Sequence, residues 1–106
     1  MSSYYSSVTP AADTWSVLVY AGGPAIGGGT INVVANNTNA YPVSVSISVS
    51  NTGAYQNDAL EWNVVIPPNG VLERGGIVLD GITSAAGIYV FSSNANVSFK
   101  AYGYSV

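Results

Sequence analysis

The chain has 106 residues, of which 48% are hydrophobic and 7% charged, with a formal net charge of −3 and neither cysteine nor histidine. This length suits one domain that buries about two-thirds of its unfolded surface, and the hydrophobic content excludes general disorder. The only cations, Arg74 and Lys100, are too few for binding to nucleic acid or to an anionic membrane, and no disulfide can form.

The low charge is the most unusual feature of the composition, because an ordinary soluble domain has about 25% charged residues. Charge keeps proteins soluble and discourages association between sheet edges. We therefore expect much of the surface either to contact neighbouring subunits or to be solvated by Ser, Asn, Thr and Tyr. No apolar run reaches the ~20 residues of a membrane-spanning helix, and the first residues lack the pattern of a secretory signal.

Residues 1–14 are rich in Ser and Tyr and show no sustained period. They predict an extended arm that precedes a single domain formed by residues 15–106. Such an arm is either frayed or docked on a neighbouring subunit. Tyr4 and Tyr5 would suit docking, because each brings apolar area with a polar tip.

Strands are predicted in residues 15–20, 30–35 and 42–50, where apolar side chains recur at every second position. The Gly-rich residues 22–29 and the asparagine-rich residues 36–39 turn the chain between them. The third strand has the clearest alternation, with serines facing outward and an apolar face that comprises Val43, Val45, Ile47 and Val49.

Four further strands are predicted in residues 60–66, 71–79, 88–92 and 97–104. We expect the last two to pair as a hairpin across residues 93–96.

Two turn signals interrupt this second half. In Pro67-Pro68-Asn69-Gly70 proline fixes φ, and Gly70 is expected to take a positive φ. Gly75-Gly76 predicts a bulge or a switch between sheets. Seven strands and no helical period predict an all-β fold: an antiparallel β-sandwich of immunoglobulin-like size, with a jelly roll or a barrel as alternatives.

The residue inventory argues against an enzyme, since Ser-His-Asp and Cys-His catalysis both need residues that the chain lacks. Glu61 and Glu73 lie on strands joined by the proline turn, but we expect them to be solvated, with Arg74 paired to Glu61. Asp58 and Asp80 lack the spacing of a calcium loop. We predict no catalytic residue, no cofactor and no metal.

Aromatic side chains are the remaining candidates. Trp15 and Trp62 stand in apolar alternation, so we expect them in the core. Tyrosines beside Asn and Ser, including Tyr89, are suited to a sugar-stacking or protein-binding surface. With the arm included, the predicted partner-binding residues are Tyr4, Tyr5, Tyr41, Tyr55, Tyr102 and Tyr104.

Residues 66–79 (IPPNGVLERGGIVL) and 88–103 (IYVFSSNANVSFKAYG) carry a recognisable pattern. The first part of the pattern is a Leu-Glu-Arg segment followed by glycine and an apolar strand. The second part is Tyr-Val, then small polar residues, then Asn-Val-Ser. This pattern resembles small β-sandwich virion structural proteins of tailed bacteriophages, and the resemblance covers about residues 60–104. It implies a capsid decoration (cement) protein or a tail, baseplate or fibre component, made in the host cytoplasm and located in the virion. It implies no catalytic residues.

The leading hypothesis is a capsid cement protein that stabilises the phage head by binding the outer shell through its arm and a sheet edge or loop face. The partners would be the major capsid protein or other virion proteins, together with further copies of the chain, with a trimer favoured. A second hypothesis is a carbohydrate- or receptor-binding module of a tail fibre that uses the exposed tyrosines. A third is a weak enzyme that uses Glu61 and Glu73.

Overall fold

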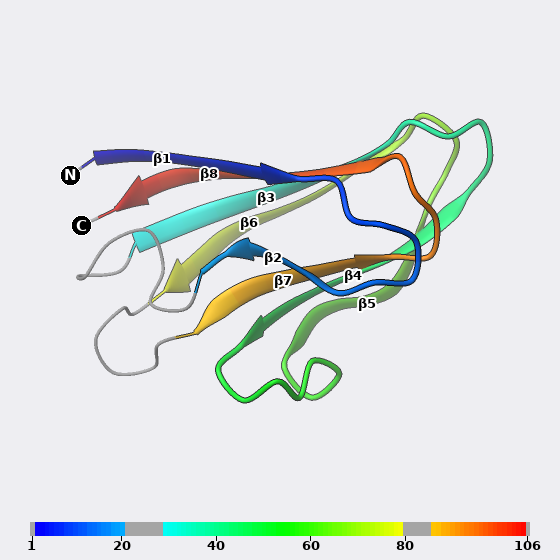
Figure 1. Cartoon of the computed structure of the whole chain (residues 1–106). Helices are drawn as coiled ribbons and strands as arrows, with labels where there is room; N and C mark the ends of the chain where they lie inside the picture. Colours follow the sequence, from blue (N-terminus) through cyan, green and yellow to red (C-terminus); the bar gives the residue numbers. More distant parts are fainter. Residues whose placement is uncertain (1, 21–28, 80–85, 106) are drawn as a thin grey trace.

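The computed structural model describes residues 2–20, 29–79 and 86–105, which form eight antiparallel strands in two four-stranded sheets packed face to face (Figure 1). Sheet I contains, in order, β1 (Ser2–Val8), β8 (Val97–Ser105), β3 (Gly29–Asn37) and β6 (Val71–Leu79). Sheet II contains, in order, β2 (Ser16–Val19), β7 (Gly87–Ser92), β4 (Val43–Ser50) and β5 (Ala59–Ile66). The predicted all-β sandwich is confirmed.

The strand order is that of a jelly roll, which was one of the predicted alternatives. The chain passes from one sheet to the other at every connection except that between β4 and β5. The hairpin predicted for residues 88–104 is therefore wrong, because β7 lies in sheet II and β8 in sheet I. Residues 93–96 form a corner between the sheets, where the Ser93 amide donates to the carbonyl of Ser44 at 2.9 Å.

The strand count is eight and not seven because Ser2–Val8 form β1. Within these residues the structure differs from the predicted arm: β1 pairs with β8 along its whole length, from Ser2 opposite Ser105 to Val8 opposite Phe99. The Ser6 hydroxyl also donates to the Leu18 carbonyl at 2.8 Å, which links β1 to sheet II. The start of β1 and the end of β8 consequently lie side by side at one end of the molecule (Figure 1).

The core lies between the two sheets and is built from the inward side chains of both. The predicted alternation in β3 and β8 is confirmed, since Ile31, Val33, Phe99 and Ala101 are fully buried. The other buried apolar residues are Leu18, Val19, Ala35, Val43, Val45, Ile47, Ile66, Ile77, Leu79, Ile88, Val90 and Val97. Full burial of one such side chain stabilises the fold by about 1.5–3 kcal/mol before entropy is counted.

The turn predictions are partly correct. The ladder between β3 and β6 shifts register opposite Gly75-Gly76, and Gly76 has a φ of 70°, so the predicted bulge is confirmed. In the proline turn, the Gly70 amide donates to the Pro67 carbonyl, but Asn69 takes the positive φ, at 56°. The expectation for Gly70 is therefore wrong, because the turn places Asn69 at its third position, the one that needs the left-handed backbone.

The predicted loop residues 21–28 and 80–85 lie outside the described residues, and so does Asp80. In the described part of the chain, no helix is long and apolar enough to cross a membrane.

Candidate interaction surfaces

An aromatic cluster covers the outer face of sheet II. Trp15 is at its centre: the Trp15 ring centroid lies 4.4 Å from that of Tyr55, 6.0 Å from that of Trp62 and 5.4 Å from that of Phe91. Tyr55 in turn contacts Tyr89 at 5.1 Å. Each such pair contributes about 0.5–1.5 kcal/mol beyond the area it buries.

The strands bring these rings together by alternation. In β7, Tyr89 and Phe91 face outward because Ile88 and Val90 face the core. Trp15 precedes β2 and reaches Phe91 across the ladder between β2 and β7.

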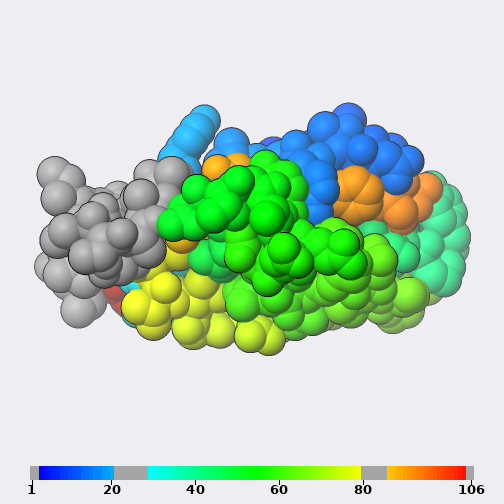
Figure 2. Space-filling model, turned by 90° about the horizontal axis from the view of Figure 1, so that it is seen from below, coloured from blue at the N-terminus to red at the C-terminus, as the bar shows by residue number. Residues whose placement is uncertain are grey.

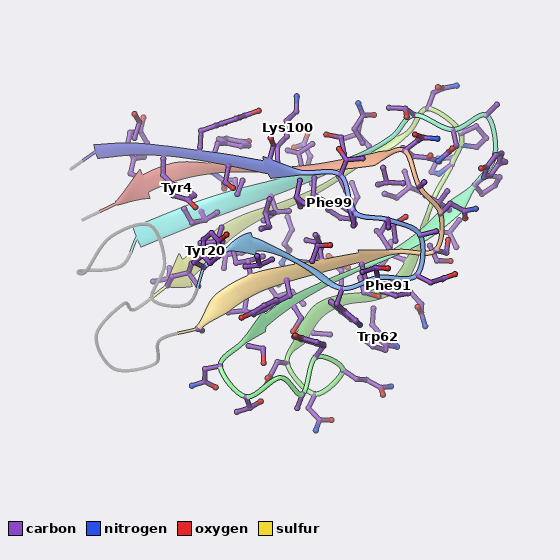
Figure 3. The ribbon with its side chains drawn as sticks, viewed as in Figure 1. Tyr4, Tyr20, Trp62, Phe91, Phe99 and Lys100 are labelled. Atoms are coloured by element: carbon purple, nitrogen blue, oxygen red, sulfur yellow. The ribbon has the colours of Figure 1, made fainter. Side chains whose placement is uncertain are left out.

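Trp62 reaches the cluster through a bulge in β5. The pairing register between β5 and β4 shifts between Val45 and Ile47 of β4, and Asn63 of β5 has a φ of 52°. The Ser46 hydroxyl accepts the Asn63 amide at 3.0 Å, which satisfies a group that the bulge would leave unpaired. Trp62 therefore lies on the outer face and is 39% exposed. The expectation that it belongs to the core is wrong. Figure 3 shows Phe99 between the sheets, and Trp62 and Phe91 on the outer side of sheet II.

The serines of β4 lie beneath this cluster. Ser46, Ser48 and Ser50 were expected to face solvent, but all three are buried. Ser46 and Ser48 stand opposite Phe91 and Tyr89 in the β4–β7 ladder, so the small serines leave room for large rings. In Figure 2, which views this side, the segment after β4 (green) covers the face beside the connection before β2 (blue).

The loop between β4 and β5 is held by one carboxylate, which fixes the position of Tyr55. Asp58 accepts hydrogen bonds from the Ser50 hydroxyl at 2.7 Å and from the Thr52 hydroxyl at 3.1 Å. The rings of the cluster thus stack on each other and are partly buried, apart from the more exposed Trp62. We conclude that the cluster forms a partly buried aromatic layer over sheet II.

The outer face of sheet I is different, because no described residue covers it. Tyr5 and Tyr102 are opposite each other in the β1–β8 ladder and Tyr104 follows, with Tyr5 65% and Tyr104 59% exposed. In β6, Val78 is 74% exposed and lies in the row that joins Tyr104, Thr30 and Val78 across three strands.

Among the described residues, two charges lie on this face, Lys100 of β8 and Glu73 of β6, and Val34 of β3 separates them. Figure 3 shows Lys100 pointing away from the sandwich. The described part of the face therefore combines tyrosines and valines with polar uncharged side chains, such as Thr30 opposite Tyr104 and Asn32 opposite Tyr102.

The six predicted partner-binding tyrosines fall into separate places. Tyr5, Tyr102 and Tyr104 come together on the outer face of sheet I. Tyr4 faces inward and packs, partly buried, against the core, and Tyr55 belongs to the aromatic cluster. The exposed Tyr41 lies in the β3–β4 connection, which is at the end of the molecule opposite the chain ends (Figure 1).

The acidic residues do not form a facing pair. The Arg74 guanidinium lies 3.4 Å from Glu61, which confirms the predicted ion pair, and it bridges the edge strands of the two sheets. Glu73 faces outward on sheet I, while Glu61 belongs to sheet II. In residues 2–20, 29–79 and 86–105, no three acidic side chains gather into a possible metal site.

No protein-family model matches the chain, and no curated protein matches it. Among solved structures, the chain is similar to a protein of Bacillus endospore appendages, a family of disulfide-linked pili, with 14% identity and a TM-score of 0.49 over 98% of this chain and 87% of that one. It is also similar to a chain of the cyanophage Pam1 capsid asymmetric unit, with 13% identity and a TM-score of 0.45 over 98% and 84%. At such identities the likeness concerns the fold alone.

Proposed function

We propose that the protein is a non-enzymatic structural subunit of a phage virion, and specifically a capsid decoration (cement) protein that binds the outer shell and stabilises the head. The uncovered outer face of sheet I is the observation that carries this proposal. It presents Tyr5, Tyr102 and Tyr104, and within the described strands Lys100 and Glu73 are its only charges. Protein interfaces are enriched in tyrosine and depleted in lysine and glutamate at their centre.

The size of this face favours a role in a repetitive assembly. Four strands about 4.8 Å apart, each about seven residues long at ~3.3 Å per residue, present roughly 440 Å². A standard specific interface buries about 800 Å² on each partner. One copy would bind weakly, whereas linked copies on a repeating shell gain a high effective concentration for each further contact.

Co-sedimentation with shells of the parent particle that lack this protein tests the proposal. Replacement of Tyr102 and Tyr104 by Ala should weaken binding at least about tenfold, which corresponds to the loss of about 1.4 kcal/mol. Tyr41→Ala is the matched control, because Tyr41 is also exposed but lies at the far end of the molecule. Binding of the double variant equal to that of the wild type would remove sheet I from the shell contact.

The second candidate is a tail, baseplate or fibre component with a carbohydrate- or receptor-binding surface. The exposed rings of Tyr5 and Tyr104 favour it, since they have no intramolecular ring partner among the described aromatic pairs. A glycan array distinguishes the two functions. Sugar binding that Tyr104→Ala abolishes, without any binding to shells, would support the second candidate.

A further inference from the structure

The sandwich has four edge strands, β1 and β6 in sheet I and β2 and β5 in sheet II. An edge strand exposes a row of unpaired amide and carbonyl groups onto which another strand can add. Proteins prevent this with short strands, charged side chains, proline or bulges. The four edges of this molecule differ in these features.

Three of the edges are protected. β2 has only four residues and shifts register between Val17 and Val19. β5 contains two register shifts and the left-handed Asn63. β6 is interrupted by the bulge at Gly75-Gly76 and carries the charged residues Glu73 and Arg74. A strand could not continue regular pairing along any of these three.

β1 has none of these features. It is seven residues long, pairs with β8 without a register shift, and contains neither charge nor proline. Its outward side chains alternate regularly as Ser3, Tyr5 and Ser7, all exposed. Within the described structure it is the one edge that is long, regular and uncharged.

We infer that β1 pairs antiparallel with β1 of a second copy, about a twofold axis, so that the two copies of sheet I form one continuous eight-stranded sheet. The outward side chains must stay on one face, which requires odd-numbered residues to oppose odd-numbered residues. The register with the greatest overlap places Tyr5 opposite Tyr5 of the second copy, and Ser3 opposite Ser7. No like charges meet across the axis, because β1 has no charge.

Two arguments favour a second copy over another partner for this edge. The contact is isologous and closes after two copies, so an unprotected edge does not lead to open-ended association. The pairing also joins two outer faces of roughly 440 Å² each, and the combined face of roughly 880 Å² reaches the about 800 Å² of a standard interface. The inference rests on the proposed structural role and gives a dimer in place of the trimer favoured in the leading hypothesis.

The absence of cysteine permits a direct test by cross-linking. In the Tyr5→Cys variant, the two thiols would face each other at the axis within reach of a disulfide. Mild oxidation should convert most of this variant to a covalent dimer on a non-reducing gel. Val78→Cys, similarly exposed but on the opposite edge of sheet I, should show no cross-linked species on the same gel. Mixed Ser3→Cys and Ser7→Cys proteins should cross-link to each other faster than either does to itself.

The native mass provides a second readout. Wild-type protein should sediment as a dimer in analytical ultracentrifugation, and Tyr5→Lys, which places two ammonium groups at the axis, should sediment as a monomer with an unchanged circular dichroism spectrum. A wild type that stays monomeric, or a Tyr5→Cys variant that cross-links no faster than Val78→Cys, would overturn the inference. A monomer that still binds shells would overturn only the β1 contact, whereas a dimer that fails to bind shells would overturn only the proposed function.

Discussion

Gly103 illustrates how closely two strands approach inside sheet I. A Cβ atom at this position would overlap the Thr30 carbonyl oxygen and lie 3.1 Å from the Ile31 Cα. Both neighbours are backbone atoms of β3, so no side chain can turn away to make room. The glycine is therefore required by the contact between β8 and β3, although in the sequence it looks like a weak point in a strand.

We expect Gly103→Ala to lower the free energy of unfolding by about 2–3 kcal/mol, because the overlap forces the backbone to shift. Urea denaturation followed by tryptophan fluorescence measures this change. Gly75→Ala is the control, since its added Cβ would meet only the side-chain oxygen of Asn32 at 3.0 Å. Equal stability of the two variants would contradict the close approach.

Asn37 joins two connections, β3–β4 and β5–β6, at the end of the molecule opposite the chain ends. Its side-chain amide donates to the carbonyls of Tyr41, Ile66 and Pro67 at 2.9–3.2 Å, and its side-chain oxygen accepts the Asn39 amide at 2.9 Å. Asn37 is fully buried. Its removal would take a donor from three carbonyls, of which that of Pro67 keeps the Gly70 amide and that of Ile66 is the most buried.

Asn37→Ala should therefore destabilise the fold by about 2–4 kcal/mol, since each unsatisfied buried group costs about 1–3 kcal/mol. Thermal denaturation checks this expectation. Asn36→Ala tests a neighbouring asparagine that is exposed, and its stability should stay within about 0.5 kcal/mol of the wild type. A small effect at Asn37 would mean that water can replace the amide.

At the scale of the elements, the aromatic cluster gives sheet II a second buried face. β4 is a central strand between β7 and β5, and its valines and isoleucine face the main core while its serines face the rings. The alternation of Val and Ser predicts the strand but not this second layer. The cover comes from Trp15, which is distant from β4 in sequence, and from the 51–58 loop, which follows β4 directly.

Trp15→Ala should lower the free energy of unfolding by about 3–5 kcal/mol, because it removes a large side chain and its three ring contacts. Chemical denaturation followed by circular dichroism provides the measurement. Tyr20→Ala, which removes an exposed ring just after β2, should change stability by less than about 0.5 kcal/mol. If both variants were equally stable, the cluster would contribute nothing to the fold.

Trp62 shows why its surface position could not be predicted from the sequence. In Leu60-Glu61-Trp62-Asn63-Val64 a strict period of two places Trp62 on the same face as Val64, toward the core. The bulge at Asn63 reverses the alternation of inward and outward side chains, so that Trp62 faces outward. The bulge in turn depends on the hydroxyl of Ser46 in β4. A tertiary contact thus decides the orientation of the largest side chain in β5.

At the scale of the whole molecule, local patterns predicted the strands well and their partners poorly. Seven of the eight strands follow from alternation and turn residues. The corner at residues 93–96 has the composition of a hairpin turn, however, and only the strand order shows that it crosses from β7 in sheet II to β8 in sheet I. Strand order also decides which tyrosines meet, so Tyr5 and Tyr102, nearly a full chain length apart in sequence, become cross-strand neighbours.

The adjacency of Ser2 and Ser105 has a consequence for engineering. A peptide or fluorescent protein fused to either end of the chain would emerge from the same pole of the molecule, away from the two connections that Asn37 joins. A short loop between the two ends would turn β1 and β8 into a hairpin and allow new termini elsewhere. In an antiparallel pair of copies joined through β1, the two poles point in opposite directions, so each fused cargo would leave from its own side.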